Sequence, residues 1–206
     1  MAAIIREKNR NLFHNNKQKG NGMMTYISLA AAALLVGIDQ LTKWLASTYV
    51  KPSGSINLIS FGGREWLNLT YQENTGAAFS ILRDKQLFLI ILTSIIILGV
   101  IILMVTKRVK KTAYIWSFAL IVAGGVGNLI DRIAYGYVVD FVDVRIIKFA
   151  VFNFADICAV VGTITLILFY IIDEVKASKA KKAKAAEQAE PTEAEASEPE
   201  NSEADE

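Results

Sequence analysis

Four long apolar blocks, separated by polar segments, constrain this chain of 206 residues more than any other feature of its sequence. Leu87–Val105 holds nineteen residues without a charge, Ala113–Ile130 holds eighteen, and Ile157–Ile172 holds sixteen. A helix rises about 1.5 Å per residue, so nineteen residues cover roughly 28 Å, close to the hydrocarbon thickness of a bilayer. The remaining block begins at Tyr26 and is interrupted by two charges.

These blocks predict an all-α membrane protein with four transmembrane helices, at about residues 26–48, 87–105, 113–131 and 156–173. Four buried core helices of a soluble protein are the alternative, but four such blocks within about 150 residues disfavour it. A cleaved signal peptide also fits poorly. The first block follows a long polar leader, and no small-residue pattern ends it before Asp39.

The lysines and arginines predict how the helices are oriented. They gather in residues 1–22, 107–111 and 176–184, which fall on one side of a four-helix arrangement. Because basic loops stay on the cytoplasmic side, we expect both termini to be cytoplasmic. Residues 49–86 and 133–155 then face the other side of the membrane. The net charge of +2 conceals this uneven distribution and by itself says nothing about partners. We expect no nucleic-acid partner.

Both ends of the chain are predicted to be appendages of a membrane domain at 23–175. Residues 1–22 form a polar cytoplasmic leader. Residues 176–206 form a cytoplasmic tail that is first lysine-rich and then acidic. Its Ala, Lys and Glu content favours a helix that continues until Pro191. Beyond it, the segment has no large apolar residue and is expected to be disordered.

The first outer connection contains two further elements. Ile56–Phe61 and Trp66–Tyr71 alternate partly around Gly62–Gly63, which predicts a small extracytoplasmic β-hairpin or sheet on the membrane surface. The mostly apolar segment Gly76–Leu82 predicts a short interfacial helix.

Polar residues within the apolar blocks are candidates for function, because ionisable groups at membrane depth are costly. Asp39 and Lys43 share a helix face at i, i+4, as do Asn128 and Arg132. The first two could form a mutually neutralising structural pair. The other two could belong to a helix-packing face, since three glycines precede them: Gly124, Gly125 and Gly127.

The expected topology places these groups near one membrane face. Asp39 and Lys43 fall in the outer half of the first span, and Arg132 at the outer end of the third. Asn153 and Asp156 open the fourth span from outside, where they could also form a capping box. A channel should show polar residues at all depths, so this clustering favours a site at the outer face.

The residue types available there favour carboxylate chemistry. One histidine, His14, and one cysteine, Cys158, exclude a multi-cysteine or two-histidine metal site, and Cys158 reads as an inert packing thiol. We expect neither a metal nor a cofactor. A Ser–Lys dyad with Lys43 is conceivable, but no serine near the outer face has supporting context. Two neighbouring aspartates cannot both ionise easily, so a pair can serve as acid and base.

Several motifs along residues 23–175 resemble those of the lipoprotein signal peptidase (signal peptidase II) family, bacterial aspartic proteases of the inner membrane. They occur in the family's order on a four-span frame with the matching topology. The motifs are Asp39-Gln40 with Lys43; Asn74-Thr75-Gly76-Ala77-Ala78-Phe79; Gly127-Asn128-Leu129-Ile130-Asp131-Arg132 with Gly136; Val138-Val139-Asp140-Phe141; and Phe152-Asn153-Phe154-Ala155-Asp156.

This resemblance implies an endopeptidase that removes the signal peptide of diacylglyceryl-modified prolipoproteins, cutting just before the lipidated cysteine. Asp140 and Asp156 would be the catalytic dyad near the outer leaflet, and Asp39 and Lys43 would hold the architecture. Membrane lipids would be further partners, and globomycin-type cyclic peptides would inhibit the enzyme. Residues 49–72 and 75–85 would cover the substrate. The residues that would position the substrate or support the dyad are Asn74, Gly76, Asn128, Arg132 and Asn153.

Three alternatives remain beside this interpretation. Asp143 lies close to Asp140 and could take its place, although Val-Val-Asp-Phe is the better match. A catalytically inactive relative is disfavoured because both aspartates are present. A non-enzymatic small membrane transporter or lipid-binding assembly factor would use the same charges for ion or headgroup contact.

Overall fold

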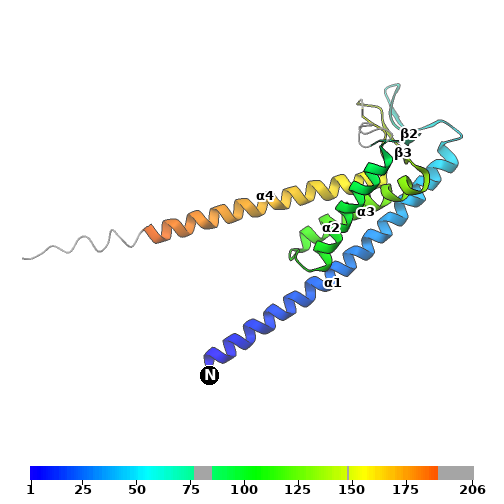
Figure 1. Ribbon diagram of the computed structural model, residues 1–206. Helices are drawn as coiled ribbons and strands as arrows, with labels where there is room; N and C mark the ends of the chain where they lie inside the picture. Colours follow the sequence, from blue (N-terminus) through cyan, green and yellow to red (C-terminus); the bar gives the residue numbers. More distant parts are fainter. Residues whose placement is uncertain (77–84, 148, 190–206) are drawn as a thin grey trace, which may run out of the picture. The chain divides into compact units, whose positions relative to one another are not determined.

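The computed structural model describes residues 1–76, 85–147 and 149–189, with side chains described for Met1 and, within these ranges, from 22 to 186 (Figure 1). The chain divides into two compact units, residues 1–166 and 167–206, which we describe separately. The candidate site residues all belong to the first unit. The expected interfacial helix falls largely on residues 77–84, and the end of the tail on 190–206, both outside the described residues.

Four long helices organise the described chain. They are α1 (Ala2–Leu45), α2 (Gln86–Val105), α3 (Thr112–Tyr135) and α4 (Phe154–Ala189). A π-helical segment, η1 (Ala46–Val50), continues α1. Within the described residues, four segments are long and apolar enough to cross a membrane: Gly22–Val50, Gln86–Val105, Thr112–Tyr135 and Phe154–Ala186. The predicted four-span fold is therefore confirmed.

The spans extend beyond the expected ranges at several ends. The third span reaches Tyr135, so it includes Asp131 and Arg132. Gly136 ends it in the left-handed conformation, with φ of 78°, and donates its backbone N–H to the carbonyl of Arg132. This cap turns the chain directly toward the strand that follows, Val138–Val144.

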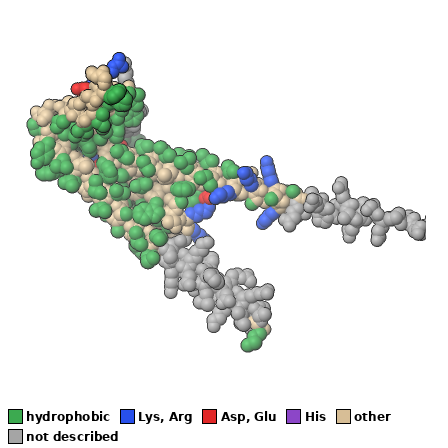
Figure 2. All heavy atoms as spheres, turned by 180° about the vertical axis from the view of Figure 1, so that it is seen from behind, with side chains coloured by type: hydrophobic (Ala, Val, Ile, Leu, Met, Phe, Trp, Pro, Cys, Tyr) green, Lys and Arg blue, Asp and Glu red, His purple; other side chains and the backbone are tan. Residues whose placement is uncertain are grey.

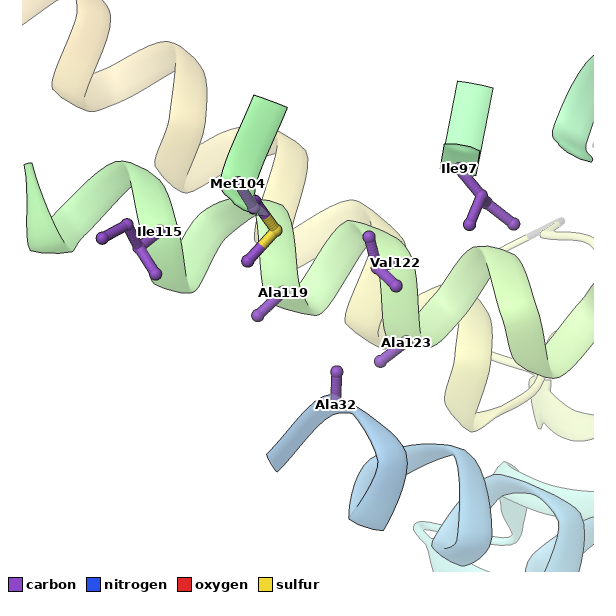
Figure 3. Packing of buried hydrophobic residues seen from close by; sticks show 7 residues of the cluster. All are labelled: Ala32, Ile97, Met104, Ile115, Ala119, Val122 and Ala123. Carbon is purple, nitrogen blue, oxygen red and sulfur yellow. The ribbon is translucent and has the colours of Figure 1, made fainter. Parts of the chain in front are cut away.

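A buried apolar cluster joins α1, α2 and α3. Figure 3 shows Ala32 of α1 pointing toward α3, where Ala123 lies, while Ile97 and Met104 approach α3 from α2. Many of the other apolar side chains are exposed, and Figure 2 shows hydrophobic side chains spread widely over the face of the helices seen in that view. Helices that are apolar on their outer faces suit a lipid environment.

Small residues let α3 and α4 approach closely. A Cβ atom on Gly124 would collide with the backbone carbonyl of Ala155, and one on Gly162 would lie 2.8 Å from the carbonyl of Ser117. Gly125 instead contacts the side chain of Ile97 on α2. The prediction that glycines permit close approach is confirmed at Gly124.

A three-stranded antiparallel sheet with order β1-β2-β3 is formed by the connections between α1 and α2 and between α3 and α4. β1 (Ser55–Phe61) and β2 (Arg64–Asn74) form the predicted hairpin, joined by Gly62 and Gly63 with φ of 59° and 73°. β3 (Val138–Val144) was not expected as a strand from the sequence. Its register sets Gln72 opposite Asp140 and Asn74 opposite Val138, which brings the second motif beside the fourth.

The second unit holds the remainder of α4, which stays helical to Ala189. This agrees with the predicted continuation of the last helix before Pro191. Its lysines are all exposed: Lys176, Lys179, Lys181, Lys182 and Lys184.

Candidate active site

Asp140 and Asp156 line one cavity of about 410 Å³. Asp140 is on β3, and Asp156 is in the first turn of α4, so a strand and a helix supply one carboxyl group each. Asn74, Asn128 and Arg132 line the same cavity. Most of the remaining lining is apolar and comes from the 149–152 segment and one face of α4: Phe149, Ala150, Val151, Phe152, Ile157, Ala159, Val160 and Val161.

Asp140 is almost fully buried, with 1% of its surface exposed. Its Oδ1 accepts the side-chain amide of Asn153 at 2.7 Å, and its Oδ2 accepts that of Asn74 at 2.9 Å. Burial, followed by the charge of Asp156, raises the pKa of Asp140 to about 7, although both amide donors oppose the shift. A carboxyl group with this pKa can hold or release a proton near neutral pH.

Asp156 is held by the start of its own helix. Its Oδ2 accepts the backbone N–H of Asn153 at 3.1 Å, and the Oδ1 of Asn153 accepts the backbone N–H of Asp156 at 2.9 Å. These reciprocal bonds are those of the predicted capping box. Its Oδ1 accepts the side-chain amide of Asn128 at 2.7 Å.

Two asparagines connect the carboxyl groups. The side-chain NH₂ of Asn153 donates to Oδ1 of Asn128 at 3.0 Å as well as to Asp140. Asn128 in turn donates to Asp156. The two carboxyl groups therefore share one hydrogen-bond network.

Arg132 and Gly76 hold the segment that follows β2. Nη2 of Arg132 donates to the carbonyl of Gly76 at 3.0 Å, and the backbone N–H of Gly76 donates to Oδ1 of Asn74 at 2.9 Å. Because its Oδ1 is engaged, Asn74 turns its NH₂ group toward Asp140. Nε of Arg132 is buried and makes no hydrogen bond within the described part of the chain. Gly76 thus contributes backbone atoms to the site, and Arg132 reaches the cavity.

Asp39 and Lys43 form an ion pair of 2.8 Å outside the cavity lining. Lys43 also pairs with Asp131 at 3.1 Å, and both its partners are 1% exposed. Asp39 accepts the backbone N–H of Ala155 at 2.8 Å, and Asp131 accepts that of Val139 at 3.0 Å. The cluster therefore joins α1 and α3 to the segments that carry the two candidate aspartates.

No role was assigned from the sequence to two members of this cluster, Gln40 and Asp131. Gln40 donates to Oδ1 of Asp131 at 3.0 Å and to the carbonyl of Gly127 at 3.1 Å. Both Gln40 and Asp131 lie within motifs that resemble those of the family, and this position is the signal that could have identified them. The apolar lining from 149–152 and from α4 also went unassigned.

Asp143 is engaged elsewhere. Its carboxylate accepts the hydroxyl of Thr70 at 2.8 Å and pairs with Nε of Arg145 at 2.7 Å. It is not among the residues that line the cavity. The geometry therefore favours Asp140 over Asp143 as the partner of Asp156.

No cluster of three or more histidine, cysteine or acidic side chains that could hold a metal ion occurs among the described residues. The two carboxyl groups in the cavity lining can act together on a water molecule. One group would accept a proton from water, and the other would supply a proton to the departing atom.

Known proteins resemble this chain over most of its length. A family model described as signal peptidase (SPase) II matches residues 31–172. A lipoprotein signal peptidase of Caldanaerobacter subterraneus subsp. tengcongensis is 42% identical over 141 residues, which are 68% of this chain and 92% of that protein. One of Enterococcus faecalis is 36% identical over 151 residues, with 71% and 88% covered. A solved bacterial membrane enzyme matches with a TM-score of 0.66 and 33% identity, covering 72% of this chain and 89% of that one.

Proposed function

We propose that Asp140 and Asp156 carry out the reaction of this chain, which belongs to the signal peptidase II family and is a membrane aspartic endopeptidase that removes the signal peptides of lipoproteins. Asp140 and Asp156 are the catalytic residues. The observation that carries this assignment is their position on one cavity, connected through Asn128 and Asn153. A transporter or lipid-binding assembly factor is not favoured, because the relatives are peptidases.

The reaction is a hydrolysis that two carboxyl groups can carry out. One carboxylate takes a proton from water as the water oxygen attacks the scissile carbonyl. The other, in its acid form, protonates the leaving amine when the carbon–nitrogen bond breaks. The pKa of Asp140, raised to about 7, fits a group that carries the shared proton at neutral pH. Asn74, Asn128, Arg132 and Asn153 support the dyad or position the substrate.

The substrate proposed is a diacylglyceryl-modified prolipoprotein, cut just before its lipidated cysteine. Two features support it. The cavity combines the two carboxyl groups with apolar walls from Phe149, Val151 and Val160. The site also stands where α3 ends and α4 begins, so it meets a peptide bond presented at the membrane surface rather than at its centre. Globomycin-type cyclic peptides are proposed as inhibitors that enter the same cavity.

In the proposed topology, both termini face the cytoplasm of a bacterial inner membrane and the dyad lies near the outer leaflet. Residues 23–175 form the peptidase domain, and residues 1–22 and 176–206 are cytoplasmic appendages. The basic residues between α2 and α3 and on the exposed end of α4 support this orientation: Lys107, Arg108, Lys110, Lys111 and the five lysines from Lys176 to Lys184. Cysteine labelling of either appendage in intact cells and in inverted vesicles tests it.

The decisive experiment is cleavage of a diacylated prolipoprotein by the purified full chain in lipid. Asp140→Asn and Asp156→Asn should each lower kcat by about 100- to 10,000-fold, because each removes a proton-transfer group. Asp143→Asn is the matched control and should keep kcat within about tenfold, since it stands outside the cavity. Globomycin should inhibit the wild type. A wild type that folds but cuts no lipidated substrate contradicts the proposal.

A further inference from the structure

The side-chain amide of Asn128 stands between a buried cation and one of the two candidate catalytic carboxylates. Its Oδ1 accepts from Nζ of Lys43 at 2.9 Å and from Nδ2 of Asn153 at 3.0 Å. Its Nδ2 donates to Oδ1 of Asp156 at 2.7 Å. The oxygen of the amide therefore accepts two hydrogen bonds, and its NH₂ group donates one to Asp156.

Lys43 favours the orientation of the Asn128 amide in which the oxygen atom faces the ammonium group. Its ammonium group has three N–H donors and no acceptor, so an atom that it contacts must be an oxygen. The ammonium is 3% exposed and is held by Asp39 at 2.8 Å and Asp131 at 3.1 Å. It cannot turn toward water, and a reversed amide would place an NH₂ group against it.

The orientation of Asn153 is fixed from a different direction. Its Oδ1 accepts the backbone N–H of Asp156, so its NH₂ group is left for Asp140 and for Asn128. That cap is built into α4 and needs no contribution from Lys43. Oδ1 of Asn128 is therefore held by two donors, and the ammonium of Lys43 is the charged one of the two. Both donors favour the orientation in which Asn128 donates to Asp156.

We propose that Lys43 is a positioning residue for peptide-bond hydrolysis, beyond its part in holding the helices together. By fixing the Asn128 amide it directs an N–H donor at Asp156 and keeps the carbonyl oxygen of that amide away from the carboxylate. This inference rests on the proposed function of the dyad. Lys43 does not line the cavity, so it acts through Asn128 and not on the substrate.

Removing the ammonium takes away the charged one of the two donors on Oδ1 of Asn128, so the remaining neutral donor from Asn153 holds the amide less firmly and the amide can reverse. In the reversed state Oδ1 of Asn128 faces the carboxylate of Asp156, and two oxygens then meet without a hydrogen between them. A misplaced reacting group costs about 100-fold in rate, so kcat should fall by about that factor while KM changes little. A residue with a purely structural role would lower the amount of folded protein and leave the kcat of the folded fraction unchanged.

Lys43→Met alone leaves two buried carboxylates without a cation, which endangers folding. The double variant Lys43→Met/Asp39→Asn avoids this problem. The wild-type cluster of one cation and two anions has a net charge of −1, and the double variant keeps it because Asp131 alone remains charged. Asp39→Asn alone is the matched control, since it retains Lys43 and keeps an oxygen for the N–H of Ala155.

A double-mutant cycle with Asn128→Ala tests the route through the amide. In the wild-type background, Lys43→Met/Asp39→Asn should lower kcat about 100-fold relative to Asp39→Asn. In the Asn128→Ala background the same exchange should change kcat by less than about threefold, because no amide is left to orient. A further loss of about 100-fold in that background would overturn the inference while leaving the proposed function intact.

A spectroscopic readout does not depend on activity. The NH₂ resonances of Asn128, assigned by their loss in Asn128→Ala, should shift on Asp156→Asn in the presence of Lys43. They should not respond in Lys43→Met/Asp39→Asn. Equal responses in both backgrounds would show that Lys43 does not orient the amide. If the wild type failed to cut any substrate, the proposed function would fall, and these resonances would still decide the role of Lys43.

Discussion

The carboxylate of Asp39 accepts the backbone N–H of Ala155 at 2.8 Å, which joins residues 116 positions apart in the chain. The bond holds the beginning of α4 against α1. The same carboxylate pairs with Lys43, so one side chain serves a helix terminus and a buried cation. Asp156 follows Ala155 directly, and its position therefore depends on the first helix.

This relationship predicts a large difference between two substitutions of Asp39. Asp39→Ala removes both the acceptor for Ala155 and an anion beside Lys43, and should destabilise the protein by about 3 kcal/mol or more. Asp39→Asn keeps an acceptor and should cost less. Thermal unfolding in detergent measures both. Glu73→Ala, which breaks the exposed pair with Lys51 and an exposed hydrogen bond from Tyr71, is the control and should change Tm little. Equal Tm losses for Asp39→Ala and Asp39→Asn would contradict the prediction.

The raised pKa of Asp140 predicts a pH-dependent stability. The pKa is 3.8 for an ordinary aspartate and about 7 in the folded protein, so the folded state keeps a proton that the unfolded chain releases. Wild-type stability should therefore decrease as pH rises from about 4 to 7, by up to about 1.4 kcal/mol per pH unit, and level off above 7.

Asp140→Asn cannot titrate at this position, so it isolates that contribution. The difference in Tm between this variant and the wild type should move in favour of the variant between pH 4.5 and 7.5. Any fixed cost of the new amide is the same at each pH and does not alter the slope. A difference that stays constant across the range would show that Asp140 titrates like an exposed aspartate.

A side chain at position 127 should have a steric effect on the buried cluster around Asp39 and Lys43. A Cβ atom there would lie 2.5 Å from Oδ2 of Asp39 and 3.0 Å from Cβ of Ala155. Gly127→Ala should therefore destabilise the protein by about 1–3 kcal/mol and lower kcat, because it displaces the contacts that support the dyad. Gly99→Ala on α2 meets nothing within 4 Å and should be neutral or slightly stabilising. Comparison of Tm and kcat for the two variants checks this prediction.

A bulky substitution of Val160 tests whether the apolar wall of the cavity contributes to substrate binding. Its side chain lines the cavity and is 56% exposed, so Val160→Trp should fill space needed by a lipidated substrate. We expect KM for a diacylated prolipoprotein to rise roughly tenfold or more, with Tm unchanged. Ile164→Trp, one turn further along α4 and outside the cavity lining, should leave KM at the wild-type value. A similar KM increase in both variants would indicate that the cavity is not the substrate site.

The helices and the local relations among candidate site residues could be predicted because their signals are local. The length of Leu87–Val105 suffices for a membrane-spanning helix, and helical spacing places Asn128 on the same face as Arg132. The capping box of Asn153 and Asp156 is likewise a local signal, because its two residues are three positions apart. β3 also carries a local signal, since Val138–Val144 is rich in β-branched residues, but the segment was interpreted only as a motif.

The contacts between distant segments could not be predicted in the same way. Lys43 lies 85 residues from Asn128, and their contact depends on how α1 is rotated against α3. That rotation follows from three-dimensional packing around Gly127, where Asp39 approaches the helix backbone. The sequence therefore indicated that Asp39 and Lys43 pair, but not that Asp131 and Asn128 share the ammonium.

The division of the dyad between β3 and α4 has a consequence for biosynthesis. Asp140 emerges with the segment after the third helix, and Asp156 emerges at the beginning of the last one. A nascent chain that ends before Phe154 lacks the second carboxyl group, the cap that orients it and much of the apolar wall. With the proposed dyad, proteolytic competence is acquired last, when the fourth helix joins the other three, and shorter translation products are expected to be inert.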